Sequence, residues 1–156
     1  AEQLIVVDIS LRSVLLARAR ARATATSKPR RDAIVGVVAA ADVALPVLDD
    51  SVDVIVAENV VDVVDDPSGL LSAFALALKP GGTLLLTSPD PDLGTMPSDP
   101  DDDETDGDEE EPALFALLEA CGFDVVDDVD GLRWPRVHGP RHVEVWTCVG
   151  LRCVKR

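Results

Sequence analysis

Lysine is scarce in this 156-residue chain: it occurs three times, and arginine makes up the remainder of the fourteen basic residues. The 29 acidic residues leave a formal net charge of −15. A chain this acidic repels phosphate backbones, which argues against nucleic acid as a partner. The acid-rich, lysine-poor balance is typical of salt-adapted proteins. It is equally consistent with one acidic loop in a protein from a GC-rich genome.

No apolar stretch approaches the roughly 20 residues that a membrane-spanning helix needs. Glu2 occupies a place where a secretory signal would be basic. The cysteines are three, an odd number, and they lack the spacing of metal ligands. These absences predict a cytoplasmic protein with reduced thiols, no membrane association and no metal site.

A glycine-rich loop is also missing near the start, where α/β nucleotide-binding folds usually cradle a phosphate or cofactor. The length suits one domain, residues 1–156. Within it, residues 89–111 form an acidic insertion that we expect to be mobile. Ten acids fall between residues 99 and 111, so the rest of the chain carries only −5.

Short apolar runs alternate with segments of helical period, which favours an α/β fold with a doubly wound, mostly parallel sheet. The last two strands follow one another without a helix between them, so we expect them to be antiparallel. Residues 26–31 and 132–141 are predicted to be a polar break and a loop. The expected strands are residues 3–7, 33–38, 52–57, 83–87, 123–129 and 142–154, and the expected helices are residues 11–25, 67–78 and 112–121.

Two places that follow expected strands carry acids. Asp8 ends the first strand, where an acid can accept both hydroxyls of a ribose; the alternative is a solvated or helix-capping residue. Asp42 and Val43 follow the second strand and could meet the amine edge of a purine, or could simply form a turn before Pro46.

Glu58 and Asn59 end the third strand, at the edge where ligands bind in such folds. They could position a substrate or polarise a reacting group, or they could satisfy nearby backbone groups. Gly81 and Gly82 lie between a helix and a strand, the reverse of an anion-binding turn, and are predicted to be structural. His138 is read as an exposed loop residue rather than a proton shuttle.

In order and spacing, four segments resemble the class I S-adenosylmethionine-dependent methyltransferases. The resemblance covers about residues 4–129. These segments are Val6-Val7-Asp8-Ile9-Ser10, Leu45-Pro46 with Asp49-Asp50-Ser51-Val52-Asp53-Val54-Ile55, Leu78-Lys79-Pro80-Gly81-Gly82-Thr83-Leu84, and Leu117-Leu118-Glu119-Ala120-Cys121-Gly122-Phe123.

The resemblance implies a Rossmann-like sheet of order 3-2-1-4-5-7-6 whose last strand is antiparallel, and S-adenosylmethionine as cofactor. Asp8 would bind the ribose hydroxyls, and Ile9 would pack against adenine. Asp42 and Val43 would meet the adenine edge. Glu58 and Asn59 would lie near the methyl group and its acceptor, with Glu58 also counted among the cofactor contacts.

Three departures limit the transfer. The family's first strand and its Gly-x-Gly-x-Gly loop would precede Gln3 and are missing. The family's second and fourth strands, here residues 3–7 and 52–57, must therefore pair with each other, leave a gap, or take a strand from a partner chain or an N-terminal segment. Ala41 stands where the family's acid would be. Val63 is apolar where some relatives carry a histidine.

We therefore expect an enzyme that transfers a methyl group to an acceptor, most readily a small molecule, with a protein as the second choice. The chain as given would be inactive if it needs the missing N-terminal segment. The alternative is a non-catalytic methyltransferase-like module that serves as a binding or scaffolding subunit.

Overall fold

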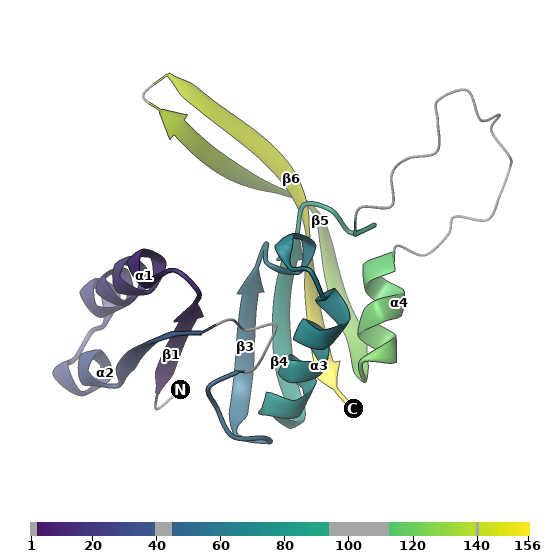
Figure 1. The fold of residues 1–156 in the computed structure, drawn as a ribbon, viewed down its shortest axis with the longest axis horizontal. Helices are drawn as coiled ribbons and strands as arrows, with labels where there is room; N and C mark the ends of the chain where they lie inside the picture. The colour runs from purple at the N-terminus through teal and green to yellow at the C-terminus, as the bar shows by residue number, and fades with distance from the viewer. Residues whose placement is uncertain (1–2, 40–44, 94–112, 140) are drawn as a thin grey trace, which may run out of the picture.

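A computed structural model describes residues 3–39, 45–93, 113–139 and 141–156. Strands and helices alternate along the chain, as the sequence predicts (Figure 1). In order, the elements are β1 (Leu4–Asp8), α1 (Leu11–Thr24), α2 (Lys28–Asp32), β2 (Ile34–Val38), β3 (Val52–Glu58), η1 (Val61–Val63), α3 (Pro67–Ala77), β4 (Leu78–Ser88), α4 (Ala113–Ala120), β5 (Phe123–Gly139) and β6 (His142–Lys155).

The described strands form two separate sheets. β1 and β2 pair in parallel, and the second sheet has the order β3-β4-β6-β5. β3 and β4 are parallel, whereas β6 is antiparallel to both of its neighbours, which confirms the prediction for the last strands. The combined order matches the methyltransferase sheet with its first strand left out, so β1 and β3 do not pair with each other.

The first sheet forms a small β-α-β unit. Ser10 caps α1 by accepting a hydrogen bond from the Ser13 N–H at 3.3 Å, as the sequence indicates. Val14 of α1 and Ile34 of β2 are buried between helix and sheet. Residues 26–31 were predicted to be a break, and this was wrong for part of them. Lys28 begins the short helix α2, because proline fits the first turn of a helix.

Helices α3 and α4 pack on the four-stranded sheet and enclose the main core. Asp66 begins α3 by accepting the Gly69 N–H at 2.8 Å, and Gly122 follows α4 at φ +88°. The fully enclosed side chains come from both helices, η1 and the strands β4, β5 and β6. They include Val61, Leu70, Leu71, Leu78, Leu84, Leu86, Leu114, Leu118, Phe123 and Cys153.

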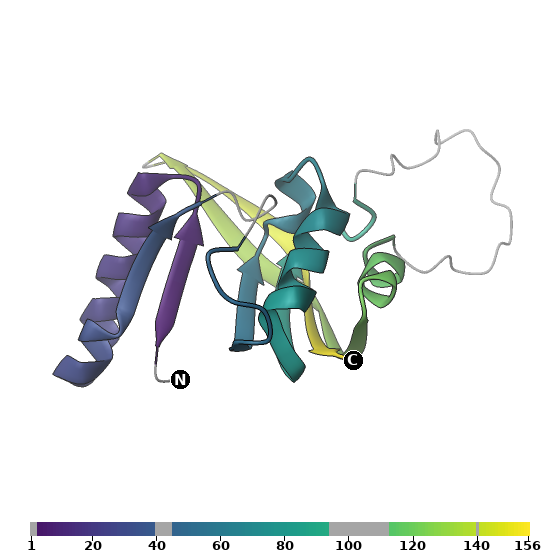
Figure 2. The ribbon, with the colours of Figure 1, turned by 60° about the horizontal axis from the view of Figure 1, so that its bottom comes forward.

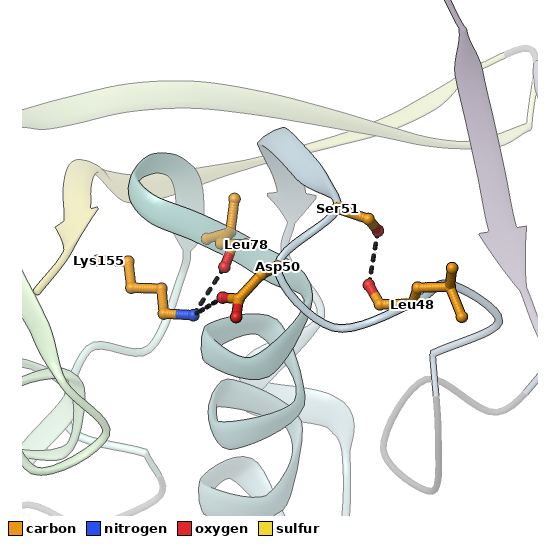
Figure 3. Close-up of polar contacts among 5 residues, drawn as sticks. All are labelled: Leu48, Asp50, Ser51, Leu78 and Lys155. Carbon is orange, nitrogen blue, oxygen red and sulfur yellow. Dashed lines mark hydrogen bonds and ion pairs between the residues drawn. The ribbon is translucent and has the colours of Figure 1, made fainter.

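A lysine ties the end of the chain to the start of this sheet. Lys155 Nζ donates to Asp50 Oδ1 and to the Leu78 carbonyl oxygen, both at 2.7 Å (Figure 3). The Ser51 hydroxyl closes the neighbouring turn onto the Leu48 carbonyl at 2.5 Å. The contacts of Lys155 hold β6, β4 and the segment before β3 together.

β5 and β6 continue beyond the sheet as a two-stranded arm (Figure 1). The prediction of a loop over residues 132–141 was therefore wrong for most of that range. Trp134 and Trp146 are direct partners across the ribbon and contact edge to face, with ring centroids 6.2 Å apart. The Arg136 guanidinium lies 4.9 and 5.4 Å from the two ring centroids. Cross-strand pairs of this kind stabilise a two-stranded ribbon, even one that contains a proline such as Pro135.

Within the described part of the chain, no helix is both long enough and apolar enough to cross a membrane.

Candidate functional site

The polar side chains predicted to form the site lie at the carboxyl ends of β1 and β3. Both strands run in the same direction and end at the same edge of the molecule in both views (Figures 1 and 2). Asp8 is the last residue of β1 and Glu58 the last of β3. In open α/β sheets this edge is where ligands bind.

Asp8 is half-buried and shapes the turn into α1. Its Oδ1 accepts a hydrogen bond from the Ser10 N–H at 2.7 Å. The other carboxylate oxygen takes part in none of the hydrogen bonds that the described residues show. Ile9 projects beside it with 74% of its surface exposed. One carboxylate oxygen of Asp8 thus serves the turn before α1, and the other is not used by it.

Asn59 follows β3 in a conformation that few residues other than glycine adopt, with φ +50°. Its N–H donates to the Thr87 carbonyl oxygen at 2.8 Å, and its Oδ1 accepts from the Thr87 hydroxyl at 2.9 Å. Thr87 therefore fixes both the backbone and the side chain of Asn59. The second Asn59 amide atom, Nδ2, takes part in none of the hydrogen bonds that the described residues show. Glu58 beside it is exposed.

Sequence reasoning missed the role of Thr87. It was read only as the end of a strand. The signal lies in the parallel register, in which Glu58 and Thr87 are paired across β3 and β4. The pairing of β3 with β4 moves from Val52–Leu78 to Val54–Thr83, so residues 79–82 of β4 are passed over opposite a single residue of β3. The register therefore depends on this irregularity and cannot be read from either strand alone.

A second polar group lies beyond β3 and β4. Burial raises the pKa of the Asp62 carboxyl, and the nearby charge of Asp90 raises it further. Asp62 Oδ1 is buried and has no hydrogen-bond partner among the described residues. Ser88 is fully buried and exchanges hydrogen bonds with the backbone of Asp90 at 3.0 and 3.1 Å. Desolvation, with a contribution from Asp62, raises the pKa of the Cys148 thiol.

The other predicted contacts, Asp42 and Val43, lie outside the described residues. Among the residues that are described, no cluster of three or more histidine, cysteine or acidic side chains could hold a metal ion.

The fold is that of an open-sheet α/β domain whose strands alternate with helices. A family model described as a methyltransferase domain matches residues 1–86, more than half of the chain. The chain therefore belongs to this family, the class I S-adenosylmethionine-dependent methyltransferases, whose cofactor is S-adenosylmethionine. No curated protein sequence matches the chain.

Solved structures show the same fold. A methyltransferase from Methanosarcina mazei matches with a TM-score of 0.68 and 20% identity over 98% of this chain and 82% of that one. The N-methyltransferase NodS from Bradyrhizobium japonicum, solved with S-adenosyl-L-homocysteine, matches with a TM-score of 0.62 and 15% identity over 98% of this chain and 66% of that one. A Haloferax volcanii complex of the Trm112 methyltransferase activator with a methyltransferase matches with a TM-score of 0.63 and 17% identity over 99% of this chain and 72% of that one. The chain thus spans less than two thirds of NodS.

Proposed function

We propose that this chain carries the nucleoside-binding and acceptor side of an S-adenosylmethionine-dependent methyltransferase that acts on a small molecule. The observation that supports it best is that Asp8 ends β1 and Glu58 ends β3, with Asn59 next in the chain, and that the two strands end at the same edge (Figure 2). In this proposal the oxygen of Asp8 that does not bind Ser10 accepts the ribose hydroxyls, and Ile9 lies against adenine.

The residues fit the nucleoside half of the cofactor. A half-buried carboxylate with one oxygen available suits a diol, and an exposed isoleucine suits a flat apolar ring. Asp42 and Val43 are proposed to meet the adenine edge. Nothing in residues 1–156 resembles a glycine loop for the methionine half. The partner proposed to complete the sheet, a further chain or N-terminal segment, would also complete this end of the site.

When bound, the cofactor supplies an electrophilic methyl group. Catalysis then depends mainly on alignment and on the removal of water from the acceptor. Asn59 is the proposed positioning group, because the contacts with Thr87 leave its Nδ2 to donate to an oxygen or a lone pair of the acceptor. Glu58, a carboxylate, is proposed to hold a polar or cationic group of the acceptor or cofactor. The negative net charge supports a small molecule rather than nucleic acid.

Calorimetry with S-adenosylmethionine tests the proposal. We expect heat from the intact chain and loss of binding in Asp8→Ala. The control Asp128→Asn also removes one acid, at an exposed position of β5, and should bind as the parent does. Binding that survives Asp8→Ala would refute the assignment of the ribose site.

One observation favours a second function, that of a non-catalytic binding subunit: β1 and β3 are not paired with each other. If the folded chain gives no heat with the cofactor even when a completing strand is supplied, this second function replaces the first.

A further inference from the structure

A carboxylate oxygen beside the proposed acceptor edge is buried without a hydrogen-bond partner. Asp62 lies three residues after Asn59, in the single turn η1 that follows β3. Its Oδ1 is buried and accepts no hydrogen bond from any residue that the structure describes. A buried polar atom without a partner costs stability, so the position of this one calls for a physical reason.

The turn that carries Asp62 is held on both sides. Val61 is fully buried in the main core, and the Val63 N–H donates to the Val60 carbonyl oxygen at 3.3 Å. Asn59, just before the turn, is bound to β4 through its side chain. The Asp62 carboxyl is therefore fixed close to the residue that is proposed to position the acceptor.

The groups nearest to the Asp62 carboxyl leave it in need of a positive charge. Burial raises the pKa of Asp62, and Asp90 is near enough for its charge to raise it further. The Cys148 thiol is also near, since the charge of Asp62 adds to the effect of burial on its pKa. The Ser88 hydroxyl exchanges hydrogen bonds with the backbone of Asp90 at 3.0 and 3.1 Å. None of these three neighbours is a cation.

The two loops that continue β3 and β4 carry acids alone. Residues 57–78 and 88–93 contain six acidic residues and no lysine, arginine or histidine. These acids are Glu58, Asp62, Asp65, Asp66, Asp90 and Asp92. Lys79 and Lys155 form their ion pairs with Asp53 and Asp50, at the other end of the sheet. Neither loop thus supplies the cation that a buried carboxylate requires.

We propose that Asp62 selects the methyl acceptor by binding a protonated nitrogen, so that the acceptor is a small molecule that carries an amine. An ammonium N–H would donate to Oδ1, and such charge-assisted hydrogen bonds are the strong ones. A neutral analogue, such as an alcohol of the same shape, would leave the buried carboxylate without a counter-charge and would be rejected. This inference rests on the proposed function, to which it adds the class of acceptor and the residue that recognises it.

A bound ammonium has an effect on Asp62 that a purely structural role of this residue lacks. The cation binds the ionised carboxylate and not the neutral acid. By linkage it must lower the pKa of Asp62, opposite to the shift that burial and Asp90 cause in the free chain. The direction of this change can be measured without cofactor and without any activity.

NMR titration of the side-chain carboxyl groups tests the proposal on the 156-residue chain. The probe is methylammonium chloride, and sodium chloride at equal concentration is the control for ionic strength. With methylammonium at about ten times its dissociation constant, the proton affinity of Asp62 should fall about tenfold further than with sodium. The exposed Asp65 should respond equally to the two salts. An equal response of Asp62 to both salts would overturn the proposal.

Two variants with the same change of charge identify the residue. Asp62→Asn should abolish the saturable changes that methylammonium causes in the amide spectrum, whereas Asp65→Asn, three residues further on, should keep them. Saturable binding that survives in folded Asp62→Asn would refute the assignment. Methanol is similar in size but neutral, so it should cause no saturable change in the parent. Equal binding of methanol and methylammonium would refute selection by charge. If Asp62→Asn unfolds, the carboxyl titration of the parent decides.

Calorimetry with S-adenosylmethionine separates this inference from the proposed function. Cofactor binding together with equal responses of Asp62 to the two salts would refute the amine acceptor and leave the methyltransferase function in place. A methylammonium site at Asp62 without any cofactor binding would refute the proposed function, and with it the acceptor role of Asp62. Cofactor binding together with the selective response to methylammonium is the result that we expect.

Discussion

Replacing Lys155 by methionine should destabilise the protein markedly, although the residue is one from the end of the chain. Its side chain is 18% exposed, and its ammonium group donates to Asp50 and to the carbonyl oxygen of the fully buried Leu78 (Figure 3). Methionine keeps the apolar stem and loses the charge. The change therefore isolates the polar contacts.

The magnitude follows from the two partners. Asp50 is 60% exposed, so its ion pair with Lys155 contributes at most about 1 kcal/mol. A buried carbonyl that loses a charged donor costs about 1–3 kcal/mol. We expect the free energy of unfolding to fall by about 2 kcal/mol, which for a chain of this size lowers the melting temperature by roughly 4–8 °C.

Lys79→Met is the matched control. Lys79 forms a similar ion pair with Asp53 at 2.6 Å, but both side chains are largely exposed and no buried carbonyl is involved. Both variants change the net charge equally. Urea unfolding should show a lower midpoint with an unchanged slope for Lys155→Met and a much smaller change for Lys79→Met. Equal midpoints for the two variants would refute the role given to the Leu78 carbonyl.

Three further predictions concern other parts of the molecule. Asp62→Asn should gain stability relative to the parent as pH rises from about 4 through the raised pKa of the carboxyl, because the parent must then ionise a buried group. Urea titrations of both proteins at pH 4 and 7 measure the difference in their free energies of unfolding, and an equal difference at the two pH values would contradict this. Cys153 is fully buried with its pKa raised to about 11, so Ellman's reagent at pH 8 should modify it only as fast as the chain unfolds. Rapid modification of Cys153 itself, told apart from the half-buried Cys121 by peptide mass spectrometry, would be incompatible with this burial. Gly36→Ala should lower the free energy of unfolding by about 1–3 kcal/mol, since a Cβ there would lie 2.5 Å from the Val14 side chain. Gly139→Ala is the control and should be nearly neutral in thermal melts, because a Cβ there meets open space. Similar losses of stability in the two variants would show that the contact with Val14 does not matter.

Much of the fold could be predicted because its signals are local. Ser10 caps one helix, Pro67 begins another and Gly122 follows the end of a third, as short sequence patterns indicate. Asp8 and Glu58 were placed at strand ends for the same reason, since each follows directly on an apolar run. Whether they bind a cofactor stays a prediction.

The features that sequence reasoning missed depend on residues far apart in the chain. The arm formed by β5 and β6 contains Pro135 and Gly131, which locally favour a loop. The pairing of Trp134 with Trp146 outweighs them, and its register cannot be read from either strand alone. The contact of Thr87 with Asn59 is of the same kind, because it exists only once β3 and β4 have paired.

The two halves of the proposed site are supported by hydrophobic cores of very different size. Glu58 and Asn59 belong to the four-stranded sheet, whose core includes side chains of α3, α4 and every strand of that sheet. Asp8 belongs to a unit in which only Val14 and Ile34 are buried hydrophobic residues among those described. A site divided in this way is limited by the weaker half, since the cofactor must first hold Asp8 in place. A strand between β1 and β3 would supply that order in advance through backbone hydrogen bonds on both sides. The chain should then bind the cofactor more tightly when this space is filled than when it is open.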